Sequence, residues 1–350
     1  MFENFFGSQD GNDPQNAEQQ SLNIRKLKIG LALGSGVARG WAHIGIIREL
    51  VKAGIVPDVI AGTSIGAVVG GAYAADALDP LEEWAMSLSK VNFFKFLDFR
   101  LSRGGLFGGQ KLFDQMNQHF GQHNIEDLKI PFAAIACELM TGHEIWLQSG
   151  NMNHAIRASF ALPGVFEPVN DNGRWLVDGA LVNPVPVSTC RALGADVVIA
   201  VNLSEDIYGS RRGSKSKSQL EDLENMAGTG RYGVYADILS SPAIAERSAS
   251  NGLLRRFLKH DKNAPSLFAN MVASLNVLQN RLSRSRLAGD PPDITINPHV
   301  GHVGLMEFHR ADELIKLGAE AFLNEKDYII DSLNFIGYHI NQNDTPPVIL

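Results

Sequence analysis

The chain has 350 residues, of which 45% are hydrophobic and 20% are charged, and its formal net charge at pH 7 is −7. This length allows one large or two small domains, and the apolar fraction is sufficient for a sizeable core. The acidic balance argues against a broad nucleic-acid-binding surface, which needs clustered basic residues.

The cysteines and the first residues of the chain bear on its compartment. Cys137 and Cys190 each lie in an apolar segment, which favours buried, reduced thiols over a disulfide or a metal site. Residues 1–26 are polar and lack the basic start and apolar core of a signal peptide. The sequence contains no run of about 18 or more apolar residues, which is the length needed to span a bilayer. We therefore expect a disordered tail at 1–26 and a cytoplasmic protein, with peripheral contact at the inner face of the membrane left open.

Apolar segments alternate with helical patterns between residues 27 and 203. The segments predicted as strands are 28–33, 57–63, 131–139, 144–150, 174–180 and 196–203. The segments predicted as helices are 41–54, 64–76 and 186–195, and 152–164 is predicted to begin as a helix that breaks before Pro163. This repeated order of strand, turn and helix predicts one α/β catalytic domain at 27–203, with a doubly wound, mainly parallel sheet flanked by helices.

The composition changes after residue 203. Residues 204–232 are first polar and basic and then acidic, which predicts a mobile linker. Residues 233–340 are expected to form a mainly helical C-terminal region that packs on the catalytic domain. Within it, 293–298 is predicted as a short strand and 308–329 as an amphipathic helix.

A serine stands where the second predicted strand meets the second predicted helix. Gly62, Thr63, Ser64, Ile65 and Gly66 match the pattern G-x-S-x-G. A nucleophilic serine has to be lifted clear of the backbone on a tight turn, and small residues two positions before and after it avoid clashes. The following helix directs its positive N-terminus at the site. We interpret Ser64 as a nucleophile; the alternative is a glycine-rich junction that is packed tightly only for structural reasons.

A glycine loop follows the first predicted strand. It consists of Gly34, Ser35, Gly36, Val37, Ala38, Arg39 and Gly40. Its spacing, G-x-G-x-x-x-G, differs from the dinucleotide fingerprint G-x-G-x-x-G, and no Gly-Lys-Ser/Thr follows as in a P-loop. We therefore interpret the loop as an oxyanion hole, with the N–H groups near Gly36 and Val37 facing the serine. For Arg39 two roles remain open: anchoring the loop, or meeting a phosphate head group.

Asp178 ends an apolar strand, immediately before Gly179 and Ala180. An acid in this place is either a structural cap or a functional group, and the residue alone does not decide between them.

Together, the glycine loop, the Gly62–Gly66 elbow and the Asp178–Ala180 turn resemble the patatin-like phospholipase family, and 156–169 resembles the run that precedes the aspartate in that family. The resemblance implies a three-layer α/β/α fold and a serine–aspartate dyad that needs no cofactor and no metal. Asp178 would take the proton of Ser64 directly, and the substrate would be a lipid ester, in a phospholipase A or lysophospholipase reaction. One departure is that Ser35 and Val37 stand where the family often has consecutive glycines.

Other assignments remain open at this stage. His299, His302 or His309 could complete a Ser–Asp–His triad, whereas His43 fits helix packing better than a role as a base. A non-catalytic lipid-binding or regulatory protein on the same fold is the main functional alternative. A nucleotide-binding regulator is disfavoured by the spacing of the glycine loop.

Two segments are candidates for contact with lipid. Residues 90–113 hold six phenylalanines and five basic residues, which suits an apolar entrance that meets anionic head groups. Residues 253–260 are a weaker candidate of the same kind. A core helix with snorkelling lysines and arginines explains either pattern equally well.

Overall fold

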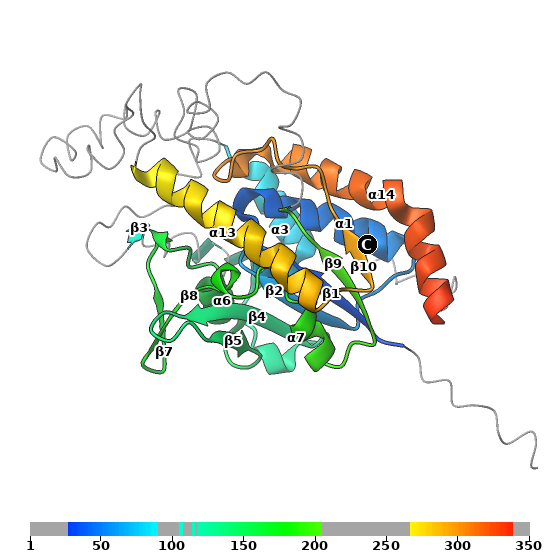
Figure 1. Cartoon of the computed structure of the whole chain (residues 1–350), viewed down its shortest axis with the longest axis horizontal. Helices are drawn as coiled ribbons and strands as arrows, with labels where there is room; N and C mark the ends of the chain where they lie inside the picture. Colours follow the sequence, from blue (N-terminus) through cyan, green and yellow to red (C-terminus); the bar gives the residue numbers. More distant parts are fainter. Residues whose placement is uncertain (1–26, 90–104, 108–113, 116–117, 205–266, 339–350) are drawn as a thin grey trace, which may run out of the picture.

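A computed structural model of the chain describes residues 27–89, 105–107, 114–115, 118–204 and 267–338 (Figure 1). The predicted segments that lie wholly or almost wholly outside these residues are 1–26, 90–113, 204–232 and 253–260.

One mixed sheet organises the described chain (Figure 1), with the strand order β10-β9-β1-β2-β4-β8-β7 and with β5 paired to β4. The parallel strands are β1 (Ile29–Leu33), β2 (Val59–Thr63), β4 (Phe132–Glu138), β9 (Val197–Val201) and β10 (Ile294–Ile296). The antiparallel strands are β5 (Glu144–Leu147), β7 (Val169–Asp171) and β8 (Arg174–Asp178). Two short strands, β3 (Gly105–Phe107) and β6 (Gly164–Phe166), pair separately.

The helices lie close to the predicted positions. They are α1 (Ala42–Lys52), α2 (Ile65–Ala74), α3 (Leu78–Ser87), α6 (Met152–Ser159), α7 (Val187–Ala192), α13 (Leu267–Gly289) and α14 (Ala311–Ile336). Short 3₁₀ turns are η1 (Val37–Trp41), η2 (Ile125–Asp127), η3 (Gly179–Leu181) and η5 (Phe308–Arg310). Helix α3, whose Leu78, Leu81 and Trp84 are buried at helical spacing, was not predicted from the sequence. Helix α14 extends seven residues beyond the predicted end at 329.

Alternation along the central strands separates two apolar layers. In β1, the side chains of Ile29, Leu31 and Leu33 belong to the large core that α1, α2 and α14 cover, whereas Ala32 belongs to a smaller core against α7. Figure 1 shows α1 and α14 on one side of the sheet and α7 on the other. Successive residues of a strand point to opposite faces, so a strand covered on both faces is apolar throughout. The predicted three-layer α/β/α fold with a mainly parallel sheet is confirmed.

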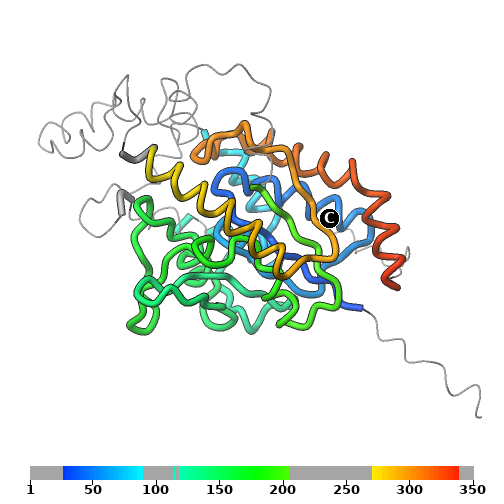
Figure 2. The backbone as a smooth tube through the Cα atoms, viewed as in Figure 1, coloured from blue at the N-terminus to red at the C-terminus, as the bar shows by residue number. Residues whose placement is uncertain are grey.

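The C-terminal segment is built into this body. β10 is the edge strand beside β9, and the long helix α13 runs across the described body (Figure 2). Near the start of α13, Met271 lies against Gly164 of β6, and near its end Arg286 Nε donates to Val182 O, just after η3, at 3.0 Å. Cys137 and Cys190 are buried and free, as expected. Within the described ranges, no helix has the length and apolar character needed to cross a membrane.

Two glycines allow α1 and α14 to pack with their backbones in close contact. A Cβ atom on Gly45 would lie 2.0 Å from Ile315 O, and one on Gly318 would lie 2.0 Å from Ala42 O. Both obstacles are backbone atoms, which cannot rotate away as a flexible side chain can. The contact therefore fixes the distance between α14 and the helix that follows the glycine loop.

We expect Gly318→Ala to destabilise the protein. Alanine favours a helix over glycine by about 1 kcal/mol, but overpacking a buried contact typically costs about 1–3 kcal/mol, so the free energy of unfolding should fall. Urea denaturation measures this, with Asn324→Ala at an exposed position of the same helix as the control. An increase in stability for Gly318→Ala equal to that of the control would show that the helices can separate without cost.

Candidate active site

Ser64 occupies a strained turn between β2 and α2. Its backbone angles are φ 58° and ψ −123°, a region that non-glycine residues rarely adopt and that costs of order 1–3 kcal/mol. The neighbouring glycines make the turn possible, because a Cβ on Gly62 would lie 2.4 Å from Gly66 O and one on Gly66 would lie 2.1 Å from Leu33 O. The geometry has the form of a nucleophile elbow at the N-terminus of a buried helix.

The register of β4 brings Asp178 to this turn. Ile135 pairs with Thr63 of β2, and the next residue, Ala136, pairs with Asp178 of β8. Both Ile135 and Ala136 also pair with β5, so β2 and β8 lie together on the opposite edge of β4. Because β2 is parallel and β8 antiparallel to β4, the two strands end facing each other. Gly179 allows the chain to turn there, since a Cβ would lie 2.2 Å from Ile135 O.

Ser64 and Asp178 form a buried pair. Ser64 Oγ donates a hydrogen bond to Asp178 Oδ2 at 2.6 Å, while Asp178 Oδ1 accepts from the N–H of Ala180 at 2.9 Å. The residues are 2% and 1% exposed. Burial raises the pKa of Asp178 to about 7, against the opposing effect of the hydrogen bonds from Ser64 and Ala180. A carboxyl with this pKa can accept and return a proton near neutral pH.

The glycine loop presents backbone donors beside the elbow. Within the described structure, the N–H groups of Gly36 and Val37 have no hydrogen-bond partner, whereas those of Gly34, Ser35 and Ala38 do. Val37 is held at φ 52°, which is strained for a β-branched residue. At the end of the loop, a Cβ on Gly40 would lie 2.1 Å from the side chain of Ile65, so Gly40 and the elbow are in close contact.

Contacts to three other segments hold the loop. The N–H groups of its early residues reach three carbonyls, in the pairs Gly34 to Val201 at 3.0 Å, Ser35 to Pro184 at 2.9 Å and Ala38 to Leu305 at 3.1 Å. The side chain of Arg39 is 1% exposed and donates to Val303 O at 2.8 Å and Gly301 O at 3.3 Å. Of the two roles considered for Arg39, these contacts are those of an anchor, because the guanidinium is enclosed rather than open to a head group.

Two of the histidines considered from the sequence, His302 and His43, have partners outside the Ser64–Asp178 pair. His302 pairs with Glu313 at 2.8 Å, and His43 contacts Gly34 O at 2.8 Å, while the hydroxyl of Ser64 points to Asp178. His119 and His123 stand four residues apart, a spacing known from metal sites on helices, yet Gly121 at φ 73° follows the end of the helix between them. Within the described ranges, no group of three or more His, Cys, Asp or Glu side chains could hold a metal ion.

Two residues at the site escaped the sequence analysis. Ser159 Oγ accepts a hydrogen bond from the N–H of Ser64 at 2.9 Å, and Asn183 O accepts one from Thr63 Oγ1 at 2.8 Å. Ser159 is fully buried. In the sequence it is a lone polar residue between Ala158 and Phe160, and this is the signal that could have identified it. The role of Asn183 depends on its main-chain carbonyl, for which the sequence carries no signal.

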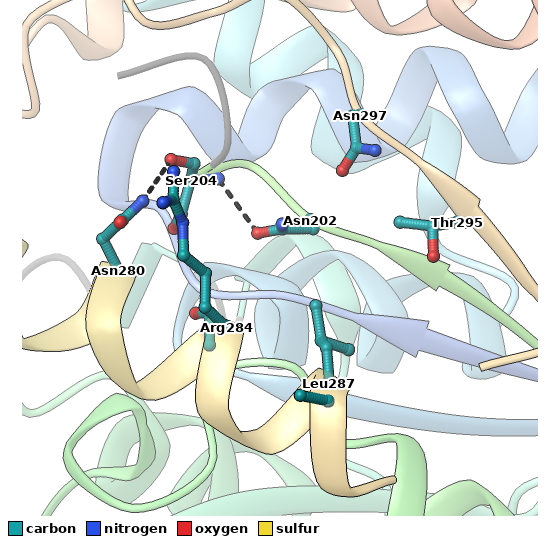
Figure 3. Close-up of a pocket in the computed structure, with 9 residues that line it drawn as sticks. Asn202, Ser204, Asn280, Arg284, Leu287, Thr295 and Asn297 are labelled. Atoms are coloured by element: carbon teal, nitrogen blue, oxygen red, sulfur yellow. Dashed lines mark hydrogen bonds between the residues drawn. The ribbon is translucent and has the colours of Figure 1, made fainter. Parts of the chain in front are cut away.

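A polar pocket of about 380 Å³ lies beside the glycine loop (Figure 3). Asn202 and Ser204 line it after β9, and Asn280 and Arg284 line it from α13; Asn280 Nδ2 donates to Ser204 O at 2.6 Å. Ser64 and Asp178 are not among its lining residues. Val201, which precedes the lining residue Asn202, accepts a hydrogen bond from the N–H of Gly34 and so connects this side of the pocket to the glycine loop.

The family described as Patatin-like phospholipase matches residues 31–191, which include the loop, the elbow and Asp178. The NTE family protein Rv1063c of Mycobacterium tuberculosis is 34% identical over 320 residues, which cover 83% of this chain and 89% of that protein. The chain belongs to the patatin-like phospholipase family. Lysophospholipase nte1 of Emericella nidulans is 28% identical over 296 residues, covering 83% of this chain but 17% of that longer protein. At the level of the family, these similarities support a lipid hydrolase.

We expect Asp178→Asn to stabilise the fold increasingly as pH rises from 4 to 7. In this interval the folded protein keeps a proton on Asp178, with a pKa of about 7, that the unfolded chain has lost, since the usual value is 3.8. The buried carboxyl therefore lowers stability progressively with pH across this interval, and Asn, which does not titrate, removes the effect.

The difference in Tm between Asp178→Asn and the unmodified protein, measured from pH 4.5 to 8, tests this expectation. It should grow up to about pH 7 and then level off. Ser159→Ala changes a neighbouring group without removing a carboxyl, so its Tm difference should not follow this course. A constant difference for Asp178→Asn would mean that burial does not perturb the carboxyl.

Proposed function

We propose that the chain is a lipid acyl hydrolase of the phospholipase A or lysophospholipase type, in which Ser64 is the nucleophile and Asp178 its base. The observation that carries this proposal is the direct hydrogen bond of 2.6 Å between Ser64 Oγ and a buried carboxylate, at a strained elbow. The similarity to a protein described as a lysophospholipase supports the choice of substrate class.

The reaction would proceed in two stages. As Ser64 Oγ attacks the ester carbonyl carbon, its proton passes to Asp178, and the new oxyanion accepts hydrogen bonds from the N–H groups of Gly36 and Val37. Collapse of this intermediate expels the alcohol, which takes the proton from Asp178 and leaves the acyl group on Ser64. A water molecule then gives one proton to Asp178 and attacks the acyl carbonyl. When this second intermediate collapses, Ser64 Oγ takes the proton back from Asp178 as the bond to the acyl group breaks, and the fatty acid is released.

The proposed reaction also requires that a lipid ester reach the buried dyad. Because Ser64 is 2% exposed, groups that cover the dyad must move before an ester carbonyl can reach Oγ. A lipid substrate is delivered from an interface, and the segment 90–113, with six phenylalanines and five basic residues, remains our proposal for that contact.

Ser64→Ala should abolish hydrolysis of a short-chain nitrophenyl ester and labelling by a fluorophosphonate, because no other group replaces the attacking oxygen. Asp178→Asn should lower the rate by about a hundredfold or more, in line with the loss of a general base. His302→Ala is the control, since the imidazole pairs with Glu313, and should retain activity. Unchanged labelling of Ser64→Ala would refute the nucleophile, and a wild-type protein that hydrolyses no ester would favour the non-catalytic lipid-binding alternative.

The pH dependence of kcat/KM reports the ionisation of the base. Asp178 acts only as the carboxylate, and its pKa is about 7. For a neutral ester, kcat/KM should therefore rise through pH 6–7 and reach a plateau above about pH 8. Initial rates from pH 5 to 9 measure the profile. A plateau that already begins at pH 5 would show that a group with a lower pKa serves as the base.

A further inference from the structure

His43 is a buried titratable residue that the proposed reaction does not use. It is the second residue of α1 and is 0% exposed. Its Nε2 lies 2.8 Å from the carbonyl oxygen of Gly34, the first residue of the glycine loop. A carbonyl oxygen only accepts hydrogen bonds, so Nε2 carries the proton and donates it.

The imidazole is neutral and only half satisfied. Burial lowers its pKa to about 4, which the hydrogen bond to Gly34 only partly opposes, so the ring is uncharged at neutral pH. With the proton on Nε2, Nδ1 is a buried acceptor, and it has no hydrogen-bond partner within the described structure. An unpaired buried acceptor lowers the stability of the fold.

The carbonyl group that His43 contacts belongs to the first residue of the loop and faces the elbow. In the same peptide unit, the N–H of Ser35 donates to Pro184 O at 2.9 Å, so both polar ends of that unit are bound. A Cβ on Gly66 would lie 2.8 Å from Gly34 O, which places this oxygen against the elbow. The free N–H groups of Gly36 and Val37 follow within three residues.

The loop needs restraints of this kind. Gly34 and Gly36 have no Cβ and permit several backbone conformations, and Val37 is strained at φ 52°. If the Gly34–Ser35 peptide unit rotated, the following N–H groups would turn with it. Such a displacement would raise the free energy of the transition state more than that of the bound substrate, because the oxyanion forms only after attack.

We propose that His43 is a positioning residue of the oxyanion-stabilising loop: by donating from Nε2 to Gly34 O, it fixes the direction of the N–H groups of Gly36 and Val37. This inference rests on the proposed function for its catalytic consequence. Its structural consequence, a rigid loop, can be measured without any activity.

Three variants test the proposal. His43→Gln keeps a donor at the end of a side chain of similar reach, whereas His43→Leu removes it. Asn153→Leu is the matched control, because Asn153 is also buried, donates to a glycine carbonyl (Gly121, 2.9 Å) and has one buried oxygen without a partner in the described structure.

The first measurement compares an ester with its thionoester. In the thionoester the developing charge lies on sulfur, a weak hydrogen-bond acceptor, so a displaced donor matters less. For His43→Leu we expect kcat on the ester to fall about tenfold or more with KM within about twofold, and kcat on the thionoester to fall much less. His43→Gln should recover most of the ester rate, and Asn153→Leu should change both substrates little. Equal losses on both substrates, or a loss as large in Asn153→Leu, would overturn the proposal.

The second measurement is amide hydrogen exchange of the peptide that spans residues 34–40. His43→Leu should exchange faster there than the unmodified protein, and His43→Gln should not. Unchanged exchange in His43→Leu overturns the proposal, whatever the activity. Faster exchange in a protein that hydrolyses no ester supports the positioning role and instead refutes the proposed hydrolase.

Discussion

The hydrogen bond between Ser64 Oγ and Asp178 Oδ2 is the interaction on which the rest of the site depends, and it imposes a constraint on the whole sheet. A direct serine–aspartate pair has no imidazole to span a gap, so the two strand ends must meet within one hydrogen bond, here 2.6 Å. The structure satisfies this by placing β2 and β8 end to end along one edge of β4, opposite Ile135 and Ala136. Such a meeting requires one parallel and one antiparallel strand, which is why the sheet is mixed at this point. It also requires glycine at positions 62, 66 and 179, where the backbones come too close for a Cβ atom.

The loop that faces this pair depends on parts of the chain that are remote in sequence. The family match ends at residue 191, yet Val201, Val303 and Leu305 all supply carbonyl groups that hold the glycine loop. The position of the last two follows from β10, which pairs with β9, and from α14, which packs on α1 through Gly45 and Gly318. The C-terminal segment thus completes the frame of the site rather than forming a separate attachment. A change in the packing of α14 can therefore displace the glycine loop through direct contacts.

The sequence was sufficient to locate the residues whose chemistry imposes a local pattern. It was insufficient to identify those whose role depends on strand register. The elbow and the glycine loop could be located because a strained turn requires small residues at fixed spacing. The role of Asp178 was ambiguous when this residue was considered alone, and it could be interpreted only together with the glycine loop and the elbow. The antiparallel direction of β8 could not be foreseen, because apolar alternation is the same for either direction. Ser159 and Asn183 were missed because a buried hydroxyl and a main-chain carbonyl acquire their roles only when distant segments meet.

Several features that lower the stability of this fold lie at the candidate site. Ser64 and Val37 are held at positive φ, the carboxyl of Asp178 is buried, and Nδ1 of His43 has no partner among the described groups. Each of these features is unfavourable to folding by itself. They persist because the surrounding structure determines the backbone almost completely. The central strands are fully buried, and the loop is held by hydrogen bonds to three other segments and by the contact of His43 with Gly34 O. The proposed reaction requires such an arrangement, because reorganisation of the donors and the base during the reaction would raise the barrier. The dense, apolar layers on both faces of the sheet therefore do more than stabilise the fold, because they supply the rigidity that keeps a strained serine and a buried carboxylate in contact.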